Sequence, residues 1–164
     1  MTLDDLDDAC AVRLFPADPS FDRESWSELS AGLSKLFAQF EREGRISAWS
    51  CDLVAGGAVV LLAWSSTADL SGCSHDKVAR LLATHEERSG RRLLTASPIV
   101  VEVAGRARCV DRAALRSLCA QGEVGPATAT WDLRVATLGA WRSGGRRPLS
   151  EILPGLVKPL VHPA

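Results

Sequence analysis

The sequence lacks several features that would assign it to a particular class of protein. No run of apolar residues reaches the roughly 18 needed to cross a bilayer, because two glycines interrupt the longest, "LVAGGAVVLLAW". The acidic N-terminus has no basic segment followed by an apolar one, as a secretory signal peptide would. The net charge of the 164 residues is −1, so no overall positive field attracts nucleic acid or an anionic membrane. These absences predict a cytoplasmic protein with neither nucleic acid nor membrane as a partner.

The cysteines do not form a recognisable framework. Their number is odd, their spacing is irregular and no CxxC pair occurs, which argues against both a disulfide scaffold and a zinc knuckle. In the cytoplasm we expect free thiols. Those that fall in predicted strands or helices are expected to be buried apolar fillers. The five are Cys10, Cys51, Cys73, Cys109 and Cys119. We predict no metal and no cofactor.

A nucleotide-binding loop is also missing. A P-loop requires glycines that expose backbone amides, a lysine for the phosphates and a hydroxyl for magnesium. No GxxxxGK[ST] motif occurs, and the nearest approach, "VAGGAV", has neither the lysine nor the hydroxyl. We therefore do not expect ATPase activity.

The strongest periodic pattern predicts a long helix between residues 22 and 44. Large apolar residues recur at spacings of three and four, which places them on one helical face. Asp22 or Ser20 can cap the start, and Gly44 suits the left-handed position after the end. At this spacing the stripe is typical of a helix that faces the core rather than of a cofactor groove. It consists of Trp26, Leu29, Leu33, Leu36, Phe37 and Phe40.

The remaining segments predict short strands and two further helices. Gly56-Gly57 and Ala104-Gly105 each separate two apolar runs, a pattern typical of β-hairpin turns. Asp111 can cap a third helix. The expected elements are strands at 10–17, 45–55 and 58–66, a helix at 74–89 that ends at Gly90, an extended segment at 92–96, a hairpin at 98–110, the third helix to residue 119, a strand at 129–135 and a helical turn at 137–143.

This order of elements predicts an α+β fold. It matches a ferredoxin-like β-α-β-β-α-β core, which has an antiparallel sheet with helices on one face, plus an added C-terminal strand and helix extension. We expect one α+β domain at 10–142, because a chain of this length favours a single core. Residues 1–9 include four acids and are expected to form an acidic N-terminal tail. Residues 143–164 are rich in proline and are expected to form an irregular C-terminal tail.

One junction between strand and helix, "LSGCSHDKVARLL", combines small and polar residues. In a structural interpretation, Ser71 or Ser74 caps the helix and Gly72 permits a sharp turn. Asp76 lies in the first turn, where the helix dipole favours an acid. Cys73 is then a small buried group.

The same junction can instead bind a ligand. Amides at a helix N-terminus point outward, and Gly72 would let a ligand approach them. Ser71, Ser74 and His75 could add hydrogen-bond donors. Asp76 opposes a strongly anionic ligand, so a neutral or zwitterionic molecule fits better.

A third interpretation is nucleophilic catalysis by Cys73. A helix N-terminus can lower the pKa of a thiol, and His75 lies close in sequence as a candidate base. A metal site is disfavoured, because Cys73 and His75 supply only two of the four ligands of a closed zinc site. From the phase set by Val78 and the turn allowed by Gly72, we expect Cys73 to be partly buried as the wall of a shallow pocket. His85 lies on the apolar stripe and is expected to be a core histidine bonded to a backbone carbonyl.

The segment around this junction resembles a family of small bacterial proteins that commonly carries the label "ABC transporter ATPase". The resemblance runs from about residue 22 to about residue 142. Its specific part is a Gly-Cys-Ser-x-Asp motif, matched by Gly72, Cys73, Ser74 and Asp76. A later "L...L...GE" pattern is matched by Leu115, Leu118, Gly122 and Glu123. The resemblance implies no particular activity, and the missing P-loop contradicts the label.

Three hypotheses on function follow. The first is a cytoplasmic domain without ATPase activity that binds a small molecule or a protein partner at residues 71–76, through Ser71, Gly72, Ser74 and Asp76. The second is a thiol-dependent enzyme with Cys73 and His75 as catalytic residues. The third is an interaction or structural protein without chemistry, for example one that forms a homodimer.

Overall fold

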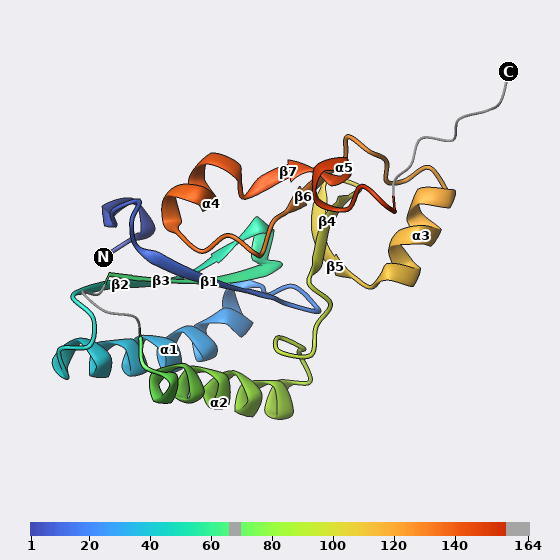
Figure 1. The fold of residues 1–164 in the computed structure, drawn as a ribbon. Helices are drawn as coiled ribbons and strands as arrows, with labels where there is room; N and C mark the ends of the chain where they lie inside the picture. Colours follow the sequence, from blue (N-terminus) through green and yellow to red (C-terminus); the bar gives the residue numbers. More distant parts are fainter. Residues whose placement is uncertain (66–69, 157–164) are drawn as a thin grey trace, which may run out of the picture.

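The structure is a computed structural model that describes residues 1–65 and 70–156. Its first sheet contains β1 (Ala11–Pro16), β2 (Ala48–Val54) and β3 (Val59–Ser65), antiparallel and in the order β1-β3-β2. The helices α1 (Arg23–Arg42) and α2 (Gly72–Ser89) both cover one face of this sheet (Figure 1).

A second antiparallel sheet follows in the sequence. It consists of β4 (Ile99–Val103), β5 (Arg106–Val110), β6 (Ala129–Trp131) and β7 (Arg146–Pro148), in the order β5-β4-β6-β7. The helices α3 (Arg112–Ala120) and α5 (Leu149–Ile152) contribute side chains to the core on one face of this sheet. A further helix, α4 (Leu138–Gly144), packs with β1 and β3 on the face of the first sheet that lies opposite α1 and α2 (Figure 1).

The predicted α+β class is confirmed, and the elements from β1 to β4 follow in the predicted β-α-β-β-α-β order. The strand pairing differs from that of a single sheet, because β4 pairs with β5 and β6 rather than with β1. At the outer edge of β1, the Val12 amide donates to the Ala136 carbonyl at 3.0 Å, and Asp18 pairs with Arg92.

The local signals for α1 act as expected. The Asp22 carboxylate accepts a hydrogen bond from the Ser25 amide at 2.7 Å and caps the helix. Gly44 follows its end with φ +70°. The stripe buries four large side chains against β3, and the other two, Trp26 and Leu36, are partly buried. The four are Leu29, Leu33, Phe37 and Phe40.

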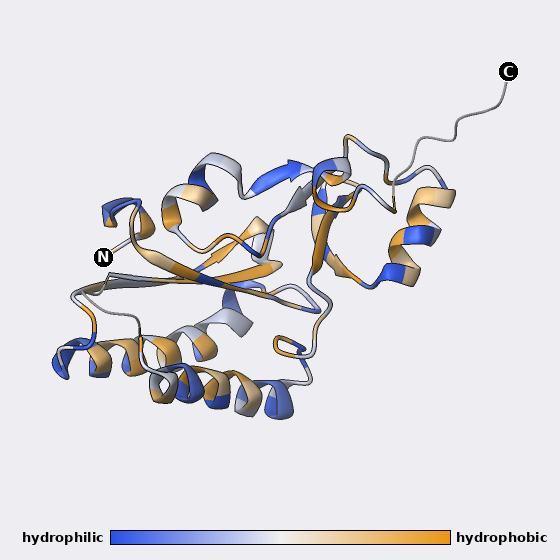
Figure 2. Cartoon of the chain, viewed as in Figure 1, coloured by the Kyte–Doolittle hydropathy of each residue, from blue (hydrophilic) through white to orange (hydrophobic). Residues whose placement is uncertain are grey.

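β3 is the central strand, and nearly all of it is buried because both faces of the first sheet are covered. Val60, Leu62 and Trp64 pack toward α1 and α2. Leu61 and Ala63 pack on the other face, toward α4. Figure 2 shows the hydrophobic character of these strands and of β4.

The two predicted hairpin turns form at the expected glycines. Ala104 and Gly105, with φ of +50° and +76°, join β4 to β5. The turn between β2 and β3 is longer than the predicted Gly-Gly pair and includes the 3-10 helix η2 (Ala55–Gly57). Gly57 has φ +92°, and a Cβ added there would lie 2.2 Å from the Phe21 carbonyl oxygen, so this close approach requires glycine.

The N-terminal segment 1–9 is not a free acidic tail. It contains the 3-10 helix η1 (Leu3–Asp5), and Leu6 is buried. Arg142 of α4 donates hydrogen bonds to the carbonyls of Leu3 and Leu6 at 2.6 and 3.0 Å and forms an ion pair with Asp8. The acidic segment is therefore anchored to the protein through Leu6 and Arg142, which the number of acids does not indicate.

The C-terminal segment 143–164 also differs from the predicted irregular tail. Residues 146–148 form β7, which is coloured hydrophilic in Figure 2, and α5 follows directly. Leu149 is fully buried in the core of the second sheet. The rest of this prediction, at residues 157–164, lies outside the described residues, as does residue 66 of the predicted strand 58–66.

Candidate functional site

The N-terminus of α2 holds the predicted site, and its two serines are occupied by internal contacts. The helix begins at Gly72, with Ser71 as its N-cap, rather than at the expected Ser74. The Ser71 hydroxyl accepts a hydrogen bond from the Ser74 amide at 3.3 Å. The Arg45 guanidinium donates to both hydroxyls, at 3.2 Å to Ser71 and 2.9 Å to Ser74. The Ser74 side chain is fully buried, so these contacts hold the start of the helix.

The expectation that Cys73 is partly buried is wrong, because Cys73 is exposed. α2 is already helical at Gly72, so Cys73 lies in regular helix, about 140° around the axis from the buried Val78. Gly72 does not make the sharp turn that was expected to swing the thiol inward. Its φ lies outside the left-handed region, and an added Cβ would meet nothing within 4 Å. Asp76 is exposed and lies beyond the first turn.

His75 lies beside Arg13 rather than beside the thiol. Its Nδ1 is 3.1 Å from Nη1 of Arg13, and its ring centroid is 6.0 Å from that of Trp64. Among the hydrogen bonds between described residues, none joins Cys73 to His75. The two catalytic candidates therefore lie near the start of α2, with the imidazole paired to Arg13 rather than to the thiol.

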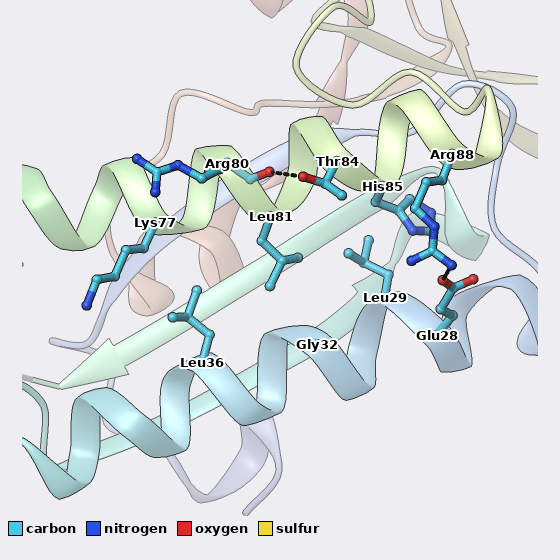
Figure 3. Close-up of a pocket in the computed structure, with 10 residues that line it drawn as sticks. All are labelled: Glu28, Leu29, Gly32, Leu36, Lys77, Arg80, Leu81, Thr84, His85 and Arg88. Carbon is cyan, nitrogen blue, oxygen red and sulfur yellow. Dashed lines mark hydrogen bonds and ion pairs between the residues drawn. The ribbon is translucent and has the colours of Figure 1, made fainter.

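A concave feature lies between α1 and α2, and we call it the interhelical hollow (Figure 3). Its volume is about 460 Å³. Leu29, Leu36 and Leu81 form an apolar floor, and Leu81 packs over Gly32, where an added Cβ would lie 3.5 Å from it. The other lining residues are Glu28, Lys77, Arg80, Thr84, His85 and Arg88.

The charged residues that line the interhelical hollow differ in whether they form ion pairs. At one end, Arg88 forms an ion pair with Glu28 at 2.9 Å. Lys77 lies at the opposite end (Figure 3), with its ammonium nitrogen 6.0 Å from the ring centroid of Phe40. Within residues 1–65 and 70–156, neither Lys77 nor Arg80 forms an ion pair. Two cations therefore remain available at the rim of an apolar surface.

His85 lines the end of the hollow that carries Glu28 and Arg88 (Figure 3). It is buried, with 8% of its surface exposed, as its place on the apolar stripe predicts. The expected carbonyl partner is not found at Nε2, which is buried and has no hydrogen-bond partner among the described residues. The centroid of its ring lies 5.8 Å from the centroid of the Phe21 ring. Burial lowers the pKa of His85, so the ring is neutral near pH 7.

A second cavity, of about 360 Å³, lies between the two sheets and borders Trp131 and Asp132. The buried Asp132 carboxylate already accepts two hydrogen bonds from the Arg134 guanidinium, at 2.8 and 3.0 Å. These hydrogen bonds lower the pKa of Asp132. The polar group of this cavity therefore has its partner inside the protein, unlike His85.

The other cysteines behave as packing residues. Burial raises the pKa of Cys51 to about 12 and that of Cys109 to about 11. Cys10 is buried and Cys119 is half-buried. No group of three or more His, Cys, Asp or Glu side chains in the described part of the chain is arranged to hold a metal ion. No helix in the same part is both long enough and apolar enough to cross a membrane.

The interhelical hollow was not predicted from the sequence, although the sequence contains a pattern that indicates it. Gly32 interrupts the apolar stripe of α1 between Leu29 and Leu36. Lys77, Arg80 and Arg88 recur at helical spacings along the next helix. Combining the two patterns requires knowing that these helices lie side by side.

Comparison with models of protein families, with curated proteins and with solved structures finds no match.

Proposed function

We propose that this protein binds, without covalent chemistry, an organic acid with an apolar chain in the interhelical hollow. The observation that carries the proposal is the pairing of an apolar floor with two cations, Lys77 and Arg80, that have no ion-pair partner among the described residues. Such a surface complements a molecule with an apolar body and a negative end.

The dimensions of the hollow set the size of the ligand. A volume of about 460 Å³ is typical of small-molecule sites, which span about 300 to 1,000 Å³. From Lys77 to His85 is eight residues, or about 12 Å along the axis of α2. With C–C bonds of about 1.5 Å, an extended chain of roughly eight to ten carbons has this length. Decanoate is therefore a suitable probe.

The predicted ligand-binding residues at 71–76 have a place in this proposal. The hollow begins at Lys77, directly after that segment. Ser71 and Ser74 are held by Arg45, so we assign them to positioning the first turn of α2. The carboxylate of the ligand would then lie near Lys77 and Arg80, where the charge is positive.

Calorimetry with decanoate below its micelle-forming concentration tests this proposal. We expect saturable binding of one molecule per chain and a higher melting temperature. Gly32→Leu should abolish binding, because its side chain extends toward Leu81 and occupies the apolar space. Lys77→Glu with Arg80→Glu should weaken binding at least tenfold. Arg116→Glu, which reverses one charge on the exposed side of α3, is the control and should have little effect.

Two results would contradict the proposal. One is the absence of binding at millimolar decanoate. The other is binding that persists unchanged in Gly32→Leu, which would place the acid elsewhere on the protein. Circular dichroism of each variant establishes that lost binding does not reflect unfolding.

A further inference from the structure

We infer that the outer edge of β5 binds an extended segment of a partner protein with acidic residues at alternate positions, which adds an antiparallel strand to the second sheet. β5 (Arg106–Val110) stands at one end of the order β5-β4-β6-β7, so within the described chain only its edge toward β4 is paired (Figure 1). This edge shares no residue with the lining of the interhelical hollow, so the two surfaces are independent.

The turn between β4 and β5 determines which backbone groups lie on the free edge. It is a two-residue hairpin loop with positive φ at both positions, so the flanking Val103 and Arg106 exchange backbone hydrogen bonds. Hydrogen-bonded pairs alternate along an antiparallel ladder. The amides and carbonyls of Ala107 and Cys109 therefore point away from β4, and they have no hydrogen-bond partner among the residues that the structure describes.

Two arginines flank this edge on one face of the sheet. Arg106 and Arg108 are exposed, and alternation along the strand directs both side chains to the same face. Neither forms an ion pair within residues 1–65 and 70–156. In an added strand, the residues opposite them form non-hydrogen-bonded pairs, in which the Cα atoms are about 4.5 Å apart. Opposite charges at such positions stabilise the pairing, so acids at alternate positions complement this edge.

The residue between the two acids meets a different environment. It would lie opposite Ala107 on the other face of the sheet, where Ala107 and Ala55 border a cavity of about 630 Å³. Asp22 and Glu102 also border this cavity, so a third acid is disfavoured there. An apolar residue such as valine suits the position and favours an extended strand. The recognised pattern is therefore acid–apolar–acid.

The N-terminus of the chain itself contains this pattern, in Asp5, Leu6 and Asp7. Leu6 is buried, however, and its carbonyl accepts a hydrogen bond from Arg142 at 3.0 Å. Binding of this segment to β5 of a second copy would require its removal from the core. We therefore assign the added strand to a different protein.

Fluorescence anisotropy at low ionic strength tests the inference, with the whole protein and the labelled peptide Ser-Thr-Glu-Val-Glu-Thr-Ser. We expect saturable binding. The isomer Ser-Thr-Val-Glu-Glu-Thr-Ser, whose adjacent acids would point to opposite faces, should bind at least about fivefold more weakly. Methylation of the valine amide nitrogen removes its hydrogen bond to the Ala107 carbonyl and should also weaken binding at least about fivefold.

Protein variants test the same edge from the other side. Arg106→Glu with Arg108→Glu should weaken peptide binding at least about tenfold, because two attractive pairs become repulsive. Lys35→Glu, which reverses an exposed charge on α1, is the control and should change the affinity less than about twofold. Ala107→Pro removes an outward amide, a change that edge strands tolerate, and should weaken binding. If circular dichroism shows that this variant is unfolded, the methylated peptide tests the same hydrogen bonding on the unchanged protein.

Four results would overturn the inference. The first is the absence of saturable binding at millimolar peptide. The second is equal binding of the peptide, its isomer and its methylated form, which would indicate charge attraction without strand pairing. The third is tighter binding of an oligothymidylate of the same length that is lost in the double arginine variant, which would indicate a nucleic-acid surface. The fourth is a dimer of the protein alone, detected by sedimentation and dissociated by the same two substitutions, which would assign the edge to a second copy.

Discussion

Nη1 of Arg45 lies 2.9 Å from Oγ of Ser74, so the segment after α1 is held against the first turn of α2. The same guanidinium reaches the N-cap residue Ser71 and pairs with Glu43 at 2.6 Å. Arg45 therefore connects the C-terminal end of one helix to the start of the other. This link fixes the two helices that enclose the interhelical hollow.

Ser71→Ala should destabilise the protein by about 1 kcal/mol, the usual cost of losing a helix N-cap. The substitution removes the side-chain acceptor of the Ser74 amide, which also donates to the Ser71 carbonyl, and one partner of Arg45. Urea denaturation followed by circular dichroism measures the change. Ser117→Ala, at an exposed position within α3, is the control and should cost less than about 0.5 kcal/mol. Equal effects at the two positions would argue against a capping role for Ser71.

The enzyme hypothesis makes a separate prediction about Cys73. A catalytic thiol would be alkylated rapidly well below the ordinary thiol pKa of about 8.5. Because His75 contacts Arg13 rather than Cys73, we expect alkylation no faster than in a short unfolded peptide that contains cysteine. Mass spectrometry after iodoacetamide treatment between pH 5 and pH 9 measures this rate.

The other thiols provide the comparison. Cys51 and Cys109 should react more slowly than Cys73, because burial raises their pKa to about 12 and about 11. A rate at Cys73 that stays high at pH 6 would revive the enzyme hypothesis, with Cys73 and His75 as its residues.

Features set by local sequence could be predicted. The stripe of α1, its Asp22 cap and its Gly44 end all depend on residues within a few positions of one another. The same holds for the turn at Ala104-Gly105. In each case the backbone conformation is specified by side chains nearby in the chain.

Features set by distant contacts could not be predicted. The pairing of β4 with β6 joins residues about 30 positions apart. The anchoring of the N-terminus depends on Arg142, more than 130 positions away. The interhelical hollow needs Gly32 and Leu81 to lie opposite each other, which periodicity within either helix does not specify. The exposure of Cys73 did follow from helical periodicity, and the error arose from assuming a special turn at Gly72.

Substitution of two glycines should have opposite effects on stability. Gly32 lies within α1, and an added Cβ would make an ordinary contact of 3.5 Å with Leu81. Gly32→Ala should therefore stabilise the protein by about 0.5 to 1 kcal/mol, through higher helix propensity. Gly57→Ala should destabilise it by at least about 2 kcal/mol, because its Cβ would clash with the Phe21 carbonyl. Equilibrium unfolding of both variants tests this, and a stabilised Gly57→Ala would contradict the geometry of the turn.

His85→Phe should stabilise the protein by about 1 kcal/mol at pH 7, because it removes a buried nitrogen without a partner. The ring of Phe21, 5.8 Å away, offers an apolar neighbour. A gain in stability would indicate that the unpaired nitrogen of His85 destabilises the wild-type protein. A loss of more than about 1 kcal/mol would instead point to a hydrogen bond that the histidine makes in solution.

The same variant should change how stability depends on pH. Burial lowers the pKa of His85 in the folded protein below the value of about 6.5 expected in the unfolded chain. Between these two values the unfolded chain binds more protons, so the free energy of unfolding falls as the pH drops below about 6.5. His85→Phe lacks this contribution, and its stability advantage over the wild type should therefore grow as the pH is lowered from 7 to 5. Carboxylates with lowered pKa values, such as Glu86 and Asp132, affect both proteins alike and cancel in the comparison. Urea unfolding at half-unit pH intervals measures the difference, and parallel curves for the two proteins would show that the folded state does not disfavour a charged ring at this position.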